Sequence, residues 1–128
     1  MKILFIGDIV GSVGREMVRT HIPLLKQQYD LDMVIANGEN AAHGKGITAK
    51  IYKQLLASGV DMITMGNHTF SKNDILHFIQ DADRLVRPAN LEPTQYGYLS
   101  LIHIYLHIGI AFREVDNFSI LHISIIHL

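Results

Sequence analysis

The sequence predicts an α/β fold with a largely parallel sheet and crossover helices. Two observations lead to this prediction. Short, continuous apolar runs alternate along the chain with segments of helical periodicity, which is the order of a parallel sheet whose strands are joined by helices. The runs are apolar throughout rather than alternating with polar residues, as expected for strands of a sheet covered on both faces.

The expected elements follow in order along the first ninety residues. The strands are predicted at residues 2–7, Met33–Ala36, Met62–Met65 and Leu85–Val86. The helices between them are predicted at residues 14–28, Ala49–Ala57 and 72–80. Every crossover thus contains one helix, and the first three strands are each followed by glycine and polar residues.

Local signals define the ends of these helices. Thr48 is a suitable N-cap for the second helix, and Gly59 follows its end. Ser71 with Asp74 three residues later has the spacing of a capping box and predicts the start of the third helix. Pro23 removes a backbone hydrogen bond from the first helix, so we expect a kink or a split there.

Composition narrows the functional classes. The chain of 128 residues has 11 basic and 12 acidic residues and a net charge of −1, so it shows no clear surface for nucleic acid or anionic membrane. It has no cysteine, which excludes disulfides, thiolate metal sites and cysteine nucleophiles. No apolar run in the first residues is long enough for a secretory signal or a membrane span of roughly 20 residues. A soluble, cytoplasmic protein without membrane partners is the expectation.

Polar side chains follow the first three predicted strands at the points where these strands end. Asp8 follows the first strand, Glu39 and Asn40 follow the second, and Asn67 and His68 follow the third. The carboxyl ends of parallel strands lie at one edge of a sheet, where ligands commonly bind. The sequence therefore predicts a single site at this edge.

The residue types of this site favour metal-dependent phosphoryl chemistry. Asp8, Glu39, Asn40 and Asn67 offer oxygen ligands suited to Mn²⁺, Mg²⁺ or Fe²⁺. A cation would also relieve the repulsion between two neighbouring carboxylates. In a two-metal hydrolase, His68 could protonate the leaving oxygen or stabilise the phosphoryl oxygens.

Each of these residues also has a plainer interpretation. Asp8 could cap a turn, and Asn67 could occupy a left-handed turn position. Five further polar residues also have plainer interpretations. His43 and Lys45 are solvated loop residues that could contact phosphate, and His21 and His77 are surface residues on helices. Arg87 closes a strand end or orients a site loop. The coincidence of three strand ends favours a site.

A dinucleotide-binding module is a second class of function. Gly7, Gly11 and Gly14 follow the first strand, but their spacing differs from that of the dinucleotide fingerprint. Asp8 would also place a negative charge beside a pyrophosphate. This interpretation is therefore the weaker one.

Four segments resemble the YmdB-type metallophosphoesterases of the calcineurin-like phosphoesterase superfamily. They are Ile6–Gly11, Asn37–Gly46, Thr64–Thr69 and Val86–Asn90. The resemblance runs in order from Met1 to about Asn90, or as far as Tyr98. It implies a β-sandwich flanked by helices, of which this chain holds the N-terminal part with an incomplete second sheet.

The resemblance also implies an activity and residue roles. The activity is a two-metal phosphodiesterase acting on 2′,3′-cyclic nucleotides, with two divalent ions, Mn²⁺ or Fe²⁺ and alternatively Mg²⁺. Asp8 corresponds to a metal ligand, Glu39 to the bridging ligand and His68 to the catalytic histidine. Asn40 and Asn67 correspond to further ligands. Val10 stands where the wider superfamily has a histidine, a departure shared by the YmdB-type proteins.

The character of the chain changes after Tyr98. Residues 99–128 are isoleucine-rich strand-like sequence without cap or turn chemistry, and they lack the family's second-half histidine motif. We therefore predict two regions, residues 1–98 as the N-terminal part of the metallophosphoesterase domain and residues 99–128 as a divergent tail outside the family fold and of artefactual origin. The open alternatives are an inactive truncated fragment that self-associates through a bare sheet face, and a non-catalytic nucleotide-binding module.

Overall fold

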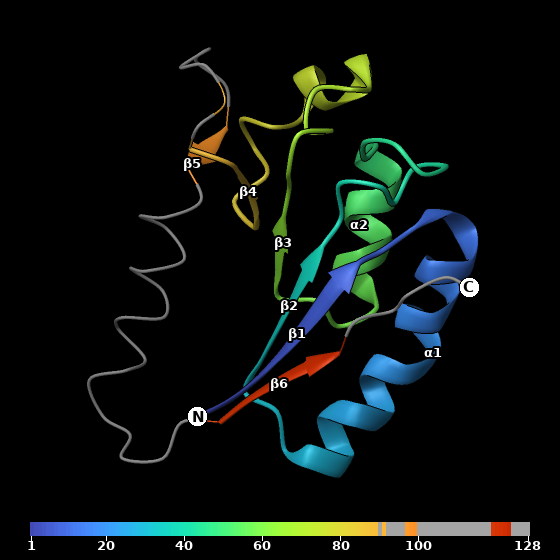
Figure 1. Cartoon of the computed structure of the whole chain (residues 1–128), viewed down its shortest axis with the longest axis vertical. Coiled ribbons are helices and arrows are strands. Elements are labelled where there is room, and N and C mark those ends of the chain that lie inside the picture. Colours follow the sequence, from blue (N-terminus) through green and yellow to red (C-terminus); the bar gives the residue numbers. More distant parts are fainter. Residues whose placement is uncertain (90, 92–96, 100–118, 124–128) are drawn as a thin grey trace.

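A parallel sheet forms the framework of the computed structural model, which describes residues 1–89, 91, 97–99 and 119–123 (Figure 1). Within these residues the sheet has six strands in the order β5-β4-β3-β2-β1-β6, and every pair is parallel. The strands are β1 (Lys2–Asp8), β2 (Met33–Asn37), β3 (Met62–Thr64), β4 (Leu85–Arg87), β5 (Tyr98–Leu99) and β6 (Ser119–Ile123). The predicted α/β fold with a largely parallel sheet is confirmed.

Helices α1 (Gly11–Tyr29) and α2 (Ala49–Ala57) lie on the same face of the sheet (Figure 1). Alternate strand residues such as Leu4 and Val34 point toward them and are completely buried, together with Ile22 of α1 and Leu55 of α2. This burial holds both helices to the sheet, since removing apolar surface from water is the main stabilising term in folding.

The intervening strand residues form a second apolar cluster, which the alternation of side chains along a strand places on the opposite face. Ile3, Ile35, Met62 and Val86 are each at most 4% exposed. These four side chains are therefore buried. Self-association stays a prediction.

Helix α1 begins three residues earlier than predicted and continues without a break past Pro23. Of the expected kink or split at Pro23, the split is wrong. Pro23 lies on the exposed side of the helix, whereas its neighbour Ile22 and Val18 one turn before are buried against the sheet. Packing of this apolar side outweighs the loss of one backbone hydrogen bond at proline.

The predicted third helix, residues 72–80, is also wrong in type and length. The chain instead forms a short 3₁₀ helix, η1 (Asn73–His77), followed by turns. Ser71 does not cap it. The Asp74 carboxylate accepts a hydrogen bond from the Ala49 backbone N–H of helix α2 at 2.7 Å, so the expected capping residue serves a different helix.

Helix α2 has the predicted bounds and the predicted cap. The Thr48 side chain accepts a hydrogen bond from the Ile51 N–H at 3.3 Å. Together, Thr48 and Asp74 satisfy two of the backbone donors that a helix N-terminus leaves without partners. Among the described residues, no helix has the length and apolar character needed to cross a membrane.

The predicted boundary at residue 98 stays a prediction. Strand β5 starts at Tyr98, and β6 lies in the predicted tail and pairs with β1 from Lys2 to Ile6. Residues 100–118 and 124–128, which include His103, His107 and His127, lie outside the described residues.

Replacement of Asp74 should destabilise the fold through helix α2. We expect Asp74→Ala to lower the free energy of unfolding by about 1 kcal/mol, as for other lost N-terminal caps. Asp74→Asn retains an oxygen acceptor and should lose less. Urea unfolding followed by circular dichroism would measure both, with the exposed Asp81→Ala as the control. Equal losses for Asp74→Ala and Asp81→Ala would show that the cap contributes nothing.

Candidate active site

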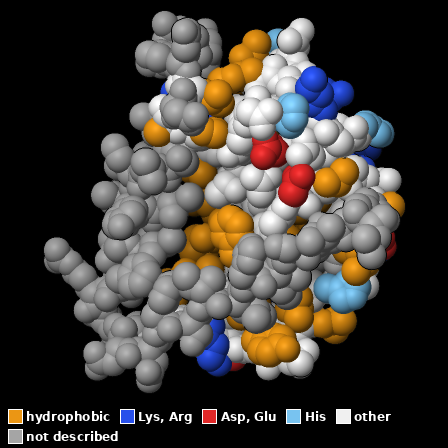
Figure 2. All heavy atoms as spheres, viewed as in Figure 1, with side chains coloured by type: hydrophobic (Ala, Val, Ile, Leu, Met, Phe, Trp, Pro, Cys, Tyr) orange, Lys and Arg blue, Asp and Glu red, His pale blue; other side chains and the backbone are white. Residues whose placement is uncertain are grey.

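The polar residues predicted from the strand ends lie along one edge of the sheet. Asp8 is the last residue of β1 and pairs in register with Asn37, the last residue of β2. Glu39 and Asn40 follow β2 directly, and the turn that carries His68 follows β3. Figure 2 shows acidic and histidine side chains next to one another near these strand ends. The parallel order β3-β2-β1 therefore brings the three segments together.

Asp8 and Asn40 are in direct contact. The Asn40 Nδ2 amide donates to Asp8 Oδ2 at 2.8 Å. The Asn40 Oδ1 atom is buried and has no hydrogen-bond partner within the described part of the chain. A buried carbonyl oxygen without a partner is costly, and a cation bound there would remove that cost. Oδ1 beside a carboxylate is a donor set that hard divalent ions prefer.

Glu39 lies against the turn that follows β3. Its carboxylate accepts a hydrogen bond from the His68 backbone N–H at 3.2 Å. A Cβ atom at Gly66 would lie 2.3–2.5 Å from the carboxylate atoms of Glu39. A side chain at position 66 would therefore have to displace the Glu39 carboxylate from its present position. On the other side, Asn37 Oδ1 accepts the Glu39 N–H at 3.1 Å.

The imidazole of His68 lies between two polar side chains. Its Nε2 is 3.5 Å from Asn67 Nδ2, and its Nδ1 is 3.3 Å from Ser71 Oγ. The turn itself is fixed by Thr69, which is completely buried and donates from its hydroxyl to the Gly66 carbonyl at 2.6 Å. The ring is half-buried and Asn67 is exposed, so His68 borders solvent at the edge of the sheet.

The loop of residues 38–46 is folded on itself by backbone hydrogen bonds. The Asn40 carbonyl accepts from Gly44 N–H at 3.0 Å and from Gly11 N–H, at the start of α1, at 3.1 Å. His43 and Lys45 of this loop are exposed, and His43 has a positive φ of 57°. The loop thus holds Asn40 against the first turn of α1.

The other three polar residues with a plainer interpretation are exposed on helices or buried in a strand. His21 and His77 are exposed on α1 and η1. Arg87 is 4% exposed on β4, and its Nη1 donates to the carbonyls of Pro88 and Leu91 at 3.3 and 3.4 Å. Arg87 therefore orders the chain directly after β4.

Three supporting residues were missed from the sequence. Asn37 fixes the Glu39 backbone, Ser71 faces His68, and Gly66 makes room for Glu39. The signal for Asn37 was available, because asparagine commonly accepts from the N–H two residues later. The roles of Ser71 and Gly66 depend on how the turn after β3 meets Glu39, which no spacing reveals.

The candidate site contains two carboxylates, and its other oxygen donors are amides. The part of the chain that the structure describes contains no group of three or more histidine, cysteine, aspartate and glutamate residues suited to a metal. Asp8, Glu39, Asn40 and Asn67 thus stay predicted ligands, and His68 stays the predicted catalytic residue.

A parallel α/β sheet with carboxylate and amide oxygens beside a histidine at its carboxyl edge defines the general class of α/β proteins whose ligand site lies at the carboxyl ends of the strands. Comparison with known families identifies the group within that class. The model of the YmdB-like protein family matches residues 4–108. The chain belongs to the YmdB-like family.

Individual relatives agree with this assignment. The chain is 61% identical over 90 residues to a 2′,3′-cyclic-nucleotide 2′-phosphodiesterase of Bacillus subtilis, a match covering 70% of this chain and 34% of that protein. The chain thus spans about a third of that relative's length.

Two solved structures resemble the fold, each with a TM-score of 0.68. A hypothetical protein of Thermus thermophilus is 28% identical, with 95% of this chain and 57% of that chain covered. A novel phosphatase of Mycoplasma pneumoniae is 30% identical, with 94% and 54% covered.

Replacement of Gly66 should displace Glu39. Gly66 does not have a positive φ, so alanine is compatible with its backbone and the clash with the carboxylate decides the outcome. We expect Gly66→Ala to cost about 1 kcal/mol of stability, at the low end for overpacked sites, because the obstructing carboxylate is the movable end of a side chain. In a Glu39→Ala background the same change should cost much less, because the obstructing carboxylate is gone. A double-mutant cycle by urea unfolding would measure this coupling, and additive costs would contradict the contact.

Proposed function

We propose that this chain carries metal ligands and the catalytic histidine of a metal-dependent phosphodiesterase. The observation that carries the proposal is the contact of Asp8 with Asn40, whose buried Oδ1 lacks a partner, next to the contact of Glu39 with the His68 turn. Membership of the YmdB-like family supports the same chemistry.

The residues present suit two divalent ions, with Mn²⁺ or Fe²⁺ preferred and Mg²⁺ as the alternative. Asp8, Asn40 and Asn67 would each be a ligand to one of the two ions, and Glu39 would be the bridging ligand. Both asparagines direct their amide nitrogens at protein groups, Asn40 at Asp8 and Asn67 at His68, which leaves the oxygens to serve as ligands. When bound, the ions supply an activated water and neutralise charge on the phosphoryl oxygens.

His68 acts as the general acid in this proposal. Hydrolysis forms a bond from water oxygen to phosphorus and breaks the ester bond, so the leaving alkoxide needs a proton. An imidazole at the solvent border can deliver that proton and regain one from water. Ser71 at Nδ1 and the Glu39 carboxylate on the backbone N–H would fix the orientation of the ring.

The proposed substrates are 2′,3′-cyclic nucleotides. This choice rests on the Bacillus subtilis relative, which is named as a 2′,3′-cyclic-nucleotide 2′-phosphodiesterase. Hydrolysis of the 2′ ester would leave a 3′-phosphate. A small-molecule phosphodiester also suits the balanced charge of the chain, which favours no nucleic-acid polymer.

Activity should depend on His68. We expect the chain to hydrolyse 2′,3′-cyclic AMP and bis-p-nitrophenyl phosphate in the presence of Mn²⁺, and His68→Ala to lower kcat by about 10²- to 10⁴-fold without weakening Mn²⁺ binding. The control is His77→Ala, an exposed histidine on η1. No turnover by the parent chain, together with no thermal response to Mn²⁺, would refute the proposal for this chain. Nucleotide binding in the presence of chelator would instead support the non-catalytic binding module.

Metal binding should stabilise the fold. At a concentration of about 100 times the dissociation constant, Mn²⁺ would add roughly 2.7 kcal/mol, which raises the melting temperature. Chelator should reverse the rise. Asn40→Ala removes the Oδ1 donor and should abolish most of it, whereas Asn73→Ala, an exposed asparagine on η1, should not change it. Differential scanning calorimetry measures each case. A full response in Asn40→Ala would exclude Oδ1 as a ligand.

A further inference from the structure

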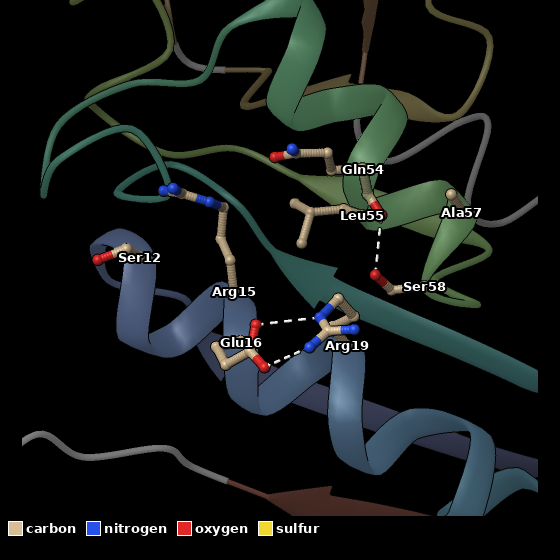
Figure 3. Close-up of a pocket in the computed structure, with 8 residues that line it drawn as sticks. All are labelled: Ser12, Arg15, Glu16, Arg19, Gln54, Leu55, Ala57 and Ser58. Atoms are coloured by element: carbon tan, nitrogen blue, oxygen red, sulfur yellow. Dashed lines mark hydrogen bonds and ion pairs between the residues drawn. The ribbon is translucent and has the colours of Figure 1, made fainter.

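A groove lies between helices α1 and α2. Its lining includes two arginines of α1, Arg15 and Arg19, which lie one turn apart together with Glu16 (Figure 3). Figure 3 shows their side chains diverging. Arg19 turns back to Glu16, whereas Arg15 extends toward the loop of residues 38–46. The two arginines therefore serve different purposes.

Arg19 and Glu16 neutralise one another at the surface. Two hydrogen bonds of 2.5 and 3.0 Å join the guanidinium to the carboxylate, and both side chains are more than half exposed. Hydrogen bonding to Arg19 lowers the pKa of the Glu16 carboxyl, so the pair stays ionised near neutral pH. With Arg19 paired and Arg15 bound elsewhere, the groove is poorly suited to binding an anion.

Arg15 reaches the loop that carries Glu39 and Asn40. Its Nη1 donates to the backbone carbonyl of Ala41, the residue directly after Asn40. Ala41 is completely buried and Arg15 is half-buried, so this contact is shielded from water. A buried carbonyl that loses its donor is costly, and a charged donor makes the stronger hydrogen bond.

Helix α1 also holds the backbone of Asn40, the residue before Ala41. The Gly11 N–H donates to the Asn40 carbonyl at 3.1 Å, and Gly11 lies four residues before Arg15, one turn away. The two carbonyls of Asn40 and Ala41 are thus fixed by donors from one helix. Their fixation leaves the Asn40 side chain directed at Asp8.

We propose that Arg15 is a positioning residue of the metal site: its guanidinium fixes the peptide after Asn40, so that the Asn40 Oδ1 is held in place for a divalent cation. The consequence for the cation rests on the proposed function, whereas the clamp on the loop does not. Lysine keeps the charge but lacks the planar guanidinium, so Arg15→Lys should replace it only in part.

Amide hydrogen exchange on the 128-residue chain tests the clamp without metal. We expect Arg15→Gln to speed exchange of the Gly44 and Gly46 amides about tenfold or more. These amides donate to the carbonyls of Asn40 and Glu39, next to the peptide that Arg15 holds. Arg19→Gln, the matched change one turn along α1, should leave them within about twofold. The Ile63 amide of β3, which is completely buried and donates to the Arg84 carbonyl, reports global stability and should be unchanged in both. Equal rates at Gly44 in the two variants would overturn the proposal.

Titration calorimetry with Mn²⁺ alone tests the consequence. We expect Arg15→Gln to weaken Mn²⁺ binding by about 10- to 100-fold, as for other groups that orient a ligand, with Arg15→Lys intermediate and Arg19→Gln unchanged. Faster exchange with unaltered Mn²⁺ affinity would overturn the positioning role. If the parent chain binds no Mn²⁺, the proposed function fails for this chain, and the exchange result still decides the clamp. Should Arg15→Gln fail to fold, Arg15→Lys supplies both readouts.

Discussion

The contact of the Glu39 carboxylate with Gly66 and with the His68 backbone N–H is the constraint on which the site depends. It joins the loop after β2 to the turn after β3, and a Cβ at position 66 would displace the carboxylate from this contact. A carboxylate that accepts a backbone N–H is oriented without a cationic partner, so its charge is not cancelled by a neighbouring side chain. The position of His68 relative to the proposed ligands follows from this contact.

The other site residues are held chiefly through their backbones. Asn37 and Thr69 bind peptide groups of the two loops, and the carbonyls of Asn40 and Ala41 are bound by groups of α1. Such support leaves side-chain oxygens available, as the partnerless Oδ1 of Asn40 illustrates. A site built for ligands gains from this division, because preorganised donors need no rearrangement on binding.

Much of the fold, and the position of the candidate site residues at one edge of the sheet, could be predicted from the sequence, because both depend on local patterns. The apolar runs marked β1 to β4, and glycine with polar residues marked the carboxyl ends of the first three. What could not be predicted depends on contacts between distant segments. Asp74 has the spacing of a local cap, yet it binds Ala49 across 25 residues. Packing of Ile22 likewise overrides the local effect of Pro23, and the role of Arg15 appears only when α1 meets the loop.

The place of β1 in the sheet bears on the order in which the chain acquires structure. Its neighbour β2 follows after a single helix, whereas its neighbour β6 comes from residues 119–123. Closing the short connection costs less chain entropy than closing the long one. All five candidate site residues lie between positions 8 and 68, on the segments that end β1, β2 and β3. The chemical groups of the site can therefore come together early during synthesis, before the strand on the other side of β1 has left the ribosome.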